Sequence, residues 1–335
     1  MTEGFVTRAR AYRIALIILP VMLAAISCTT TMDRSELATE YYNLGTAFFD
    51  LGDLPRSADY LSRAIELDES LAQASYNLAR VYALQGRFGE AEALLNSLRL
   101  LEPDNTTIIE TLAYVAYSRG ELDTAASTYD EVLQIDPGNL NALYNRALIA
   151  DETGDLERAS VLLHSASAVD ERDVSVLELL ASVEQRRDNP SGAISALEDL
   201  KEIGSISVEA RIRLADLYEE SERYDLALEE LEVVVTTADT LESQSGALFR
   251  KGRILLTAAE EPEAGVAALR LAFESGFSDR DQIEKLRSDP RFDPGGEAGD
   301  LLSEYALEPV DPIPGETSQE GEEPPAAPPG ETGDK

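Results

Sequence analysis

The chain has 335 residues, 44% of them hydrophobic, and a formal net charge of −36. The hydrophobic share is large enough to bury a core, so the composition excludes a wholly disordered chain. Because the charge is strongly negative, the surface repels phosphate backbones, and no nucleic acid is expected among the partners.

The first 27 residues have the character of a targeting signal. Arg8, Arg10 and Arg13 form a positive start, and an apolar run of 13 residues follows over 14–26. A membrane-spanning helix needs about 20 residues, so a cleaved signal peptide over 1–27 is the better interpretation.

The apolar run ends in Ala25-Ile26-Ser27-Cys28, which resembles the lipobox of bacterial lipoproteins. The resemblance implies cleavage before Cys28, the only cysteine, and lipidation of its sulfur; the alternative is a free thiol in an uncleaved anchor. Two or more acyl chains hold a protein stably at a bilayer. We therefore expect a lipid-anchored protein of the bacterial cell envelope, on the outer membrane facing the periplasm or at the cell surface, with 28–37 as a short linker.

A 34-residue repeat follows the linker. The tyrosine–asparagine pair Tyr42-Asn43 returns as Tyr76-Asn77 and, two periods later, as Tyr144-Asn145. A glycine recurs at the same interval of 34 residues, at Gly52, Gly86, Gly120 and Gly154. Each follows a helical pattern, and glycine is favoured there because a residue without a Cβ adopts a left-handed backbone at the lowest cost.

The pattern resembles the tetratricopeptide-repeat family. With six repeats starting at 38, 72, 106, 140, 174 and 208, position 8 of each repeat is Gly or Ala and position 20 is Ser or Ala. Small residues at these two positions let the helices of a hairpin pack closely. The resemblance implies an all-α, right-handed solenoid of antiparallel helix pairs, with about six to seven repeats.

The end of the chain departs from this pattern. A degenerate seventh repeat is expected from 245, so the array covers 38–275, and capping helices are expected over 276–307. Seven of the 15 prolines fall in 309–329, without apolar periodicity, so 308–335 is interpreted as a disordered, acidic tail.

The resemblance also implies a binding surface. In the family, positions 2, 5, 9, 12 and 13 of each first helix line a concave groove. Here the N-terminal half of that groove is aromatic and the C-terminal half is acidic, so we expect a protein or peptide partner with an aromatic or apolar anchor and a basic end. The alternative is that the tyrosines are ordinary packing residues of the repeat. Some family members also use asparagines at position 6 to hold the backbone of a bound peptide, since an amide supplies both a donor and an acceptor. The expected groove residues are Tyr42, Phe49, Tyr76, Tyr114, Tyr117, Tyr144, Asp216, Glu219 and Glu220, together with Asn43, Asn77 and Asn145 at position 6.

The sequence contains no combination of residues that is typical of a catalytic or metal-binding site. The single histidine, His164, is expected to face solvent, and no cysteine or second histidine can join it in a metal site. We therefore predict no enzyme activity, no metal and no cofactor. The leading interpretation is a membrane-anchored scaffold or adaptor in envelope assembly, secretion or cell-wall regulation. The alternative is a ligand-handling lipoprotein accessory to a periplasmic transport system.

Overall fold

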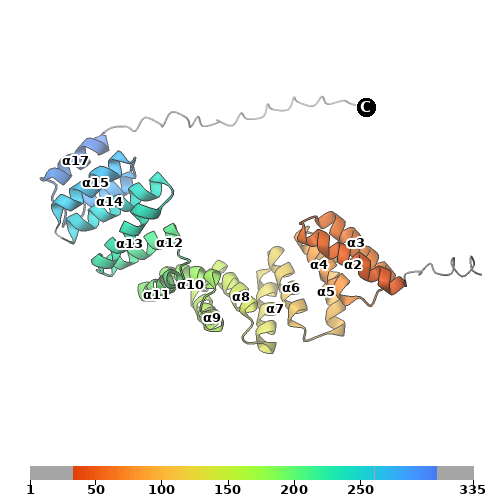
Figure 1. Ribbon diagram of the computed structural model, residues 1–335. Coiled ribbons are helices and arrows are strands. Elements are labelled where there is room, and N and C mark those ends of the chain that lie inside the picture. Colours follow the sequence, from red (N-terminus) through yellow and green to blue (C-terminus); the bar gives the residue numbers. More distant parts are fainter. Residues whose placement is uncertain (1–32, 260, 308–335) are drawn as a thin grey trace, which may run out of the picture. The chain divides into compact units, whose positions relative to one another are not determined.

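The computed structural model describes residues 33–259 and 261–307, and every regular element in these ranges is an α-helix (Figure 1). The signal, Cys28 and the tail from 308 lie outside the described residues. The chain divides into two compact units at Asn189 and Pro190. The predicted all-α fold of antiparallel helix pairs is confirmed.

Between residues 33 and 189, the part of the first unit that the structure describes, there are four helix pairs and a ninth helix, each packed against its neighbours in sequence. Their bounds are α2 (Arg34–Asp50), α3 (Leu54–Leu67), α4 (Ala72–Leu84), α5 (Phe88–Leu101), α6 (Thr106–Ser118), α7 (Leu122–Ile135), α8 (Leu140–Glu152), α9 (Leu156–Val169) and α10 (Val174–Arg186).

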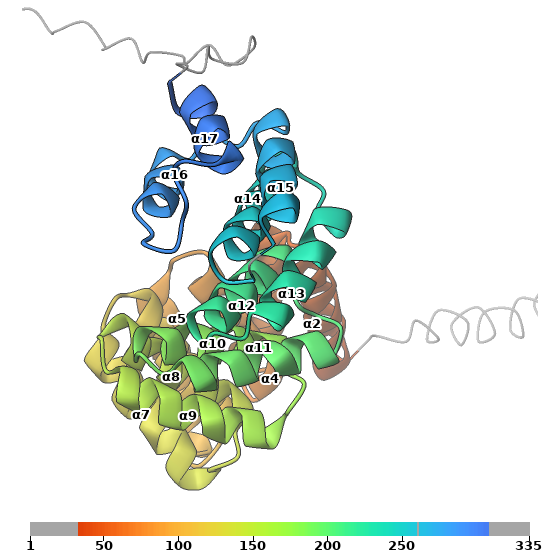
Figure 2. The same cartoon turned by 90° about the vertical axis from the view of Figure 1, so that its left-hand side faces the viewer.

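The second unit contains the remaining helices, and Figure 2 shows α14 and α15 lying side by side in it. The bounds are α11 (Pro190–Glu202), α12 (Val208–Glu220), α13 (Tyr224–Thr237), α14 (Leu241–Thr257), α15 (Pro262–Glu274), α16 (Arg280–Arg287) and α17 (Glu297–Leu307).

Polar caps and left-handed residues determine where the helices begin and end. Asn139 caps α8, because its side chain accepts a hydrogen bond from the Ala142 amide at 2.8 Å. The four repeated glycines all have positive φ, between 73° and 79°. Asp188 and Glu222 continue this 34-residue series with φ of 56° and 58°, although neither is a glycine.

Small residues bring the two helices of each pair together. Gly45 in α2 faces Leu61 in α3 so closely that a Cβ on the glycine would lie 2.6 Å from Leu61 Cγ. Ala79 and Ala125, at the small positions of the second and third repeats, are fully buried. Such contacts leave room for one large side chain between the helices of a pair.

The last two helices cover the end of the second unit. Leu286 from α16 and Leu301 from α17 join Phe249 and Phe273 in one buried cluster. This cover matters because a solenoid otherwise ends in an exposed apolar face.

Candidate partner-binding face

We define the first-helix face as the side chains at positions 2, 5, 9, 12 and 13 of the first helix of each repeat. In the first unit this face has an aromatic centre. The Arg80 guanidinium lies 4.7 Å from the ring centroid of Phe49 and 5.9 Å from that of Tyr76. The Tyr76 hydroxyl lies 3.1 Å from Thr111 Oγ1 on α6. These contacts tie α2, α4 and α6 together across the face.

The remaining tyrosines of this face differ in their freedom to contact a partner. Tyr114 is exposed, at 42% of its surface, whereas Tyr42, Tyr117 and Tyr144 are partly buried. Tyr117 donates a hydrogen bond to Glu152 on α8, and this bond, together with burial, raises the pKa of Tyr117 to about 12. Burial is also the main cause that raises the pKa of Tyr144.

The three asparagines of the expected groove differ in exposure and in hydrogen-bond partner. Asn43 is exposed. Asn77 donates to Thr46 Oγ1 on α2 at 3.4 Å, and Asn145 donates to the Asn141 carbonyl of its own helix at 2.8 Å. Two of these amides therefore make hydrogen bonds within the protein, and Asn43 is the amide most available to the backbone of a bound peptide.

Two of the three acidic residues expected on this face of the second unit are paired with arginines. Arg250 Nε donates to Asp216 Oδ1 at 2.9 Å, and Arg253 Nη2 donates to Glu219 Oε2 at 2.6 Å. Both arginines lie on α14, 34 residues after their partners. Glu220 remains exposed. The charges of Asp216 and Glu219 are therefore balanced by arginines of α14, a helix beyond the six regular repeats on which the prediction of an acidic half was based.

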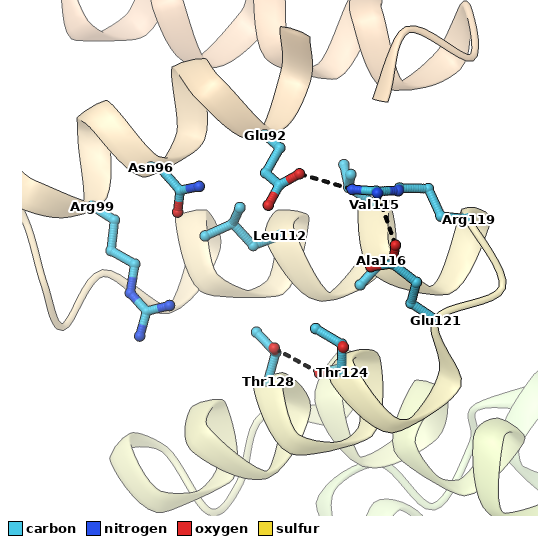
Figure 3. A pocket seen from close by; sticks show the side chains of 10 residues that line it. All are labelled: Glu92, Asn96, Arg99, Leu112, Val115, Ala116, Arg119, Glu121, Thr124 and Thr128. Atoms are coloured by element: carbon cyan, nitrogen blue, oxygen red, sulfur yellow. Dashed lines mark hydrogen bonds and ion pairs between the residues drawn. The ribbon is translucent and has the colours of Figure 1, made fainter. Parts of the chain in front are cut away.

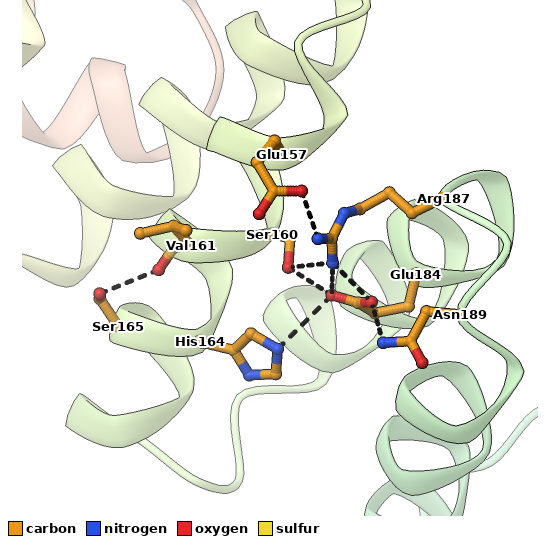
Figure 4. Close-up of polar contacts among 8 residues, drawn as sticks. All are labelled: Glu157, Ser160, Val161, His164, Ser165, Glu184, Arg187 and Asn189. Carbon is orange, nitrogen blue, oxygen red and sulfur yellow. Dashed lines mark hydrogen bonds and ion pairs between the residues drawn. The ribbon is translucent and has the colours of Figure 1, made fainter.

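One buried polar cluster combines the residue types of a catalytic triad. Ser160 Oγ donates to Glu184 Oε1, and His164 Nε2 lies 3.4 Å from the same oxygen (Figure 4). Nucleophilic activation requires the histidine to accept the serine proton, but here both side chains point to the carboxylate. Ser160 is also buried. The arrangement holds a buried carboxylate and has no geometry for attack on a substrate.

Within residues 33–259 and 261–307, no group of three or more His, Cys, Asp or Glu side chains could hold a metal ion. None of the helices described there is both long and apolar enough to cross a membrane.

Comparisons with known proteins agree with this fold. The tetratricopeptide-repeat family matches twice, at residues 42–105 and 116–183. A lipoprotein of unknown role from Treponema pallidum is 35% identical over 88 residues, which are 26% of this chain and 45% of that relative. The match therefore spans less than half of the relative's length.

Two solved structures align with large parts of this chain. The type IV pilus biogenesis factor PilW aligns with 64% of this chain and 99% of its own, at 13% identity and a TM-score of 0.51. A tetratricopeptide-repeat protein from Parabacteroides merdae aligns with 75% of this chain and 98% of its own, at 23% identity and a TM-score of 0.48. At such identities the likeness to PilW shows the fold alone.

The stacked helix pairs and the first-helix face define an α-helical repeat protein without a recognisable catalytic site in the described residues. The family matches make the class specific: the chain is a tetratricopeptide-repeat protein. Such repeats are protein-interaction modules and typically form non-enzymatic scaffolds, so the chain is a scaffold for protein–protein interaction.

Proposed function

We propose that this protein is a lipid-anchored scaffold of the bacterial envelope, which holds a segment of a partner protein on the first-helix face of its first unit. The observation that carries the proposal is the aromatic centre around Arg80, Phe49 and Tyr76. Aromatic rings provide a large contact area at low entropic cost. Since the whole chain carries a net charge of −36, a partner with basic surroundings would be attracted at long range.

Anchoring through Cys28 is the second part of the proposal. It is supported by the signal-like sequence before this cysteine and by the similarity to the Treponema pallidum relative, which is a lipoprotein. Mass spectrometry of the protein purified from membranes tests it. We expect a chain that begins at Cys28 with acyl chains attached; an unmodified cysteine, or retention of residues 1–27, would contradict the anchor.

Photo-cross-linking tests the binding face. A photo-reactive residue placed at exposed Tyr114 should cross-link a partner in intact cells, whereas the same residue at Gln134, exposed on α7, serves as the control. We expect one protein species to be captured from position 114 and not from 134. Equal capture from both positions would contradict binding on the first-helix face.

The biological process is the open part of the proposal. Envelope assembly, secretion and cell-wall regulation all employ anchored scaffolds, and the partner captured at position 114 would select among them. The alternative function, an accessory to a periplasmic transport system, requires a small-molecule ligand. It would gain support only if position 114 captured no protein.

A further inference from the structure

In several repeats the side chain at position 11 of the first helix lies beside the second helix of the preceding repeat. In the second repeat this residue is Tyr82, with Arg87 lying 3.8 Å over its ring. In the sixth it is Tyr218, which is 2% exposed, donates to Glu198 Oε1 at 2.5 Å and lies under Arg223. The common arrangement is a phenol ring with an arginine over its face. At Tyr218 a carboxylate also accepts the hydrogen bond of the hydroxyl.

Two other repeats have charged side chains in this place. In the fifth, position 11 is Glu184, held by Arg187 and Asn189, with His164 beside it (Figure 4). In the fourth, position 11 is only Ala150, but Arg146 and Arg158 both reach Asp130, each at 3.0 Å. Asp130 and Glu198 occupy the same repeat position.

The third repeat has no ring in this place, and the charged side chains near it line a pocket instead of filling the space. Position 11 is Ala116, and a pocket of about 140 Å³ lies beside it, between α5, α6 and α7. Figure 3 shows Leu112, Val115 and Ala116 in the middle of the pocket, with Asn96 and Arg119 on opposite sides. Its other lining residues are Glu92, Arg99, Glu121, Thr124 and Thr128.

The lining of this pocket corresponds in part to the surroundings of a buried tyrosine. Position 16, which is Arg87 beside Tyr82 and Arg223 beside Tyr218, is Glu121 here, and the arginine of this pocket stands two positions earlier. Ala116 lies 102 residues, three periods, before Tyr218, and Asn96 lies three periods before Glu198, which accepts the hydrogen bond of the Tyr218 hydroxyl. Arg119, held by Glu92 and Glu121 at 2.8 Å each, brings a guanidinium to the rim. An enclosed apolar cavity of about 150 Å³ is large enough to bind benzene, so the volume of this pocket, which is open to solvent and partly polar, is close to that of one ring.

We propose that the Ala116 pocket is a second binding site, which receives the tyrosine side chain of a partner protein. The ring would lie on Leu112 and Ala116, and the amide of Asn96 would bond to its hydroxyl. Asn96 and Thr124 are exposed, so a side chain can enter from solvent while its backbone stays outside. The pocket lies on the opposite side of α6 from Tyr114 and Tyr117, so it is separate from the first-helix face.

Ligand-observed NMR on the full chain tests the site, with N-acetyl-tyrosinamide, N-acetyl-leucinamide and p-cresol as probes. We expect saturation transfer to the tyrosine probe and to p-cresol, and none to the leucine probe. Ala116→Tyr should fill the pocket from within and lower the affinity for the tyrosine probe about tenfold or more. Ser127→Tyr adds the same ring at an exposed position of α7 and should leave binding unchanged.

A second variant covers the case in which Ala116→Tyr does not fold. Asn96→Ala removes only the partner of the hydroxyl, so it should weaken binding of the tyrosine probe and leave binding of N-acetyl-phenylalaninamide unaffected.

Two results would overturn the proposal: binding of the tyrosine probe that survives Ala116→Tyr in a folded protein, or binding of the tyrosine probe that is no stronger than that of the leucine probe. Binding of p-cresol without N-acetyl-tyrosinamide would also overturn it, because the site would then exclude a side chain attached to a backbone. The Tyr76→Ala, Tyr144→Ala variant should bind the probes normally, which separates this site from the first-helix face.

Discussion

Arg253 Nη2 donates to Glu219 Oε2 over 2.6 Å and so connects α14 to α12. The two side chains are only 11% and 18% exposed. Replacing Glu219 with lysine leaves Arg253 unpaired and facing a like charge. We expect Glu219→Lys to reduce the free energy of unfolding by about 2 kcal/mol or more. Thermal unfolding followed by circular dichroism measures the loss, and Glu220→Lys on the exposed neighbour is the matched control. Equal melting temperatures for the two variants would show that the pair contributes nothing.

The tight contacts between paired helices give a second prediction. Ala125 on α7 is fully buried, and the 34-residue register places it at a small position. Ala125→Leu adds three carbons to a filled space and should cost about 1–3 kcal/mol of stability. Ser127→Leu adds a leucine to an exposed position of the same helix and should cost much less. If both variants melt together, Ala125 does not occupy a tight contact.

These two cases show which features the sequence could predict. Ala125 was predictable because position 20 is small in all six repeats, and close helix packing requires this wherever the repeat occurs. The pair of Arg253 with Glu219 was not, because it depends on where long side chains point in a repeat whose pattern is degenerate. The pocket beside Ala116 was also not predicted, because an alanine at position 11 is ordinary in sequence. It becomes informative only when the structure shows that a tyrosine fills this place in the second and sixth repeats.

Backbone conformation gives a third prediction. Gly154 has φ of 79° and Glu222, two periods later, has φ of 58°. A Cβ on Gly154 would meet no atom within 4 Å, so only the left-handed backbone opposes a side chain there. Gly154→Ala should therefore cost about 1 kcal/mol, a fall of about 2–4 °C in melting temperature.

The converse change at the sixth repeat should have the opposite sign. Glu222→Gly relieves the left-handed strain, although the unfolded chain gains freedom and offsets part of the benefit. We expect a small rise in melting temperature, and Glu222→Ala, which keeps the Cβ, should show none. A fall for Glu222→Gly would mean that the glutamate side chain supports the turn.

The buried carboxylate of Glu184 gives a prediction about pH. Burial alone would raise its pKa, but hydrogen bonds from Ser160 and Asn189 and the charge of Arg187 outweigh burial, so the pKa lies below the ordinary value of 4.5. A lowered folded-state pKa stabilises the protein above pH 4.5, and this contribution is lost as the pH falls through the folded-state pKa. Glu184→Gln should therefore be less stable than wild type at neutral pH, by about 2 kcal/mol, and the difference should shrink in acid.

Urea unfolding of the two proteins between pH 7 and pH 3 measures this difference. Glu178→Gln, on the exposed side of the same helix, is the control and should follow wild type throughout. A difference between wild type and Glu184→Gln that stays constant with pH would show that the charge of Glu184 is not what stabilises the cluster.

The last prediction concerns the partner that cross-linking at position 114 would identify. Aromatic anchors mainly determine how long a complex lasts, whereas charges at the rim mainly determine how fast it forms. Tyr76→Ala combined with Tyr144→Ala should therefore raise the dissociation rate about tenfold or more and leave association nearly unchanged. Glu220→Lys, at the exposed carboxylate on α12, should slow association at low salt only. Surface plasmon resonance resolves the two rates, and Gln134→Ala on α7 serves as the control. If the double tyrosine variant dissociates like wild type, the first-helix face is not where this partner binds.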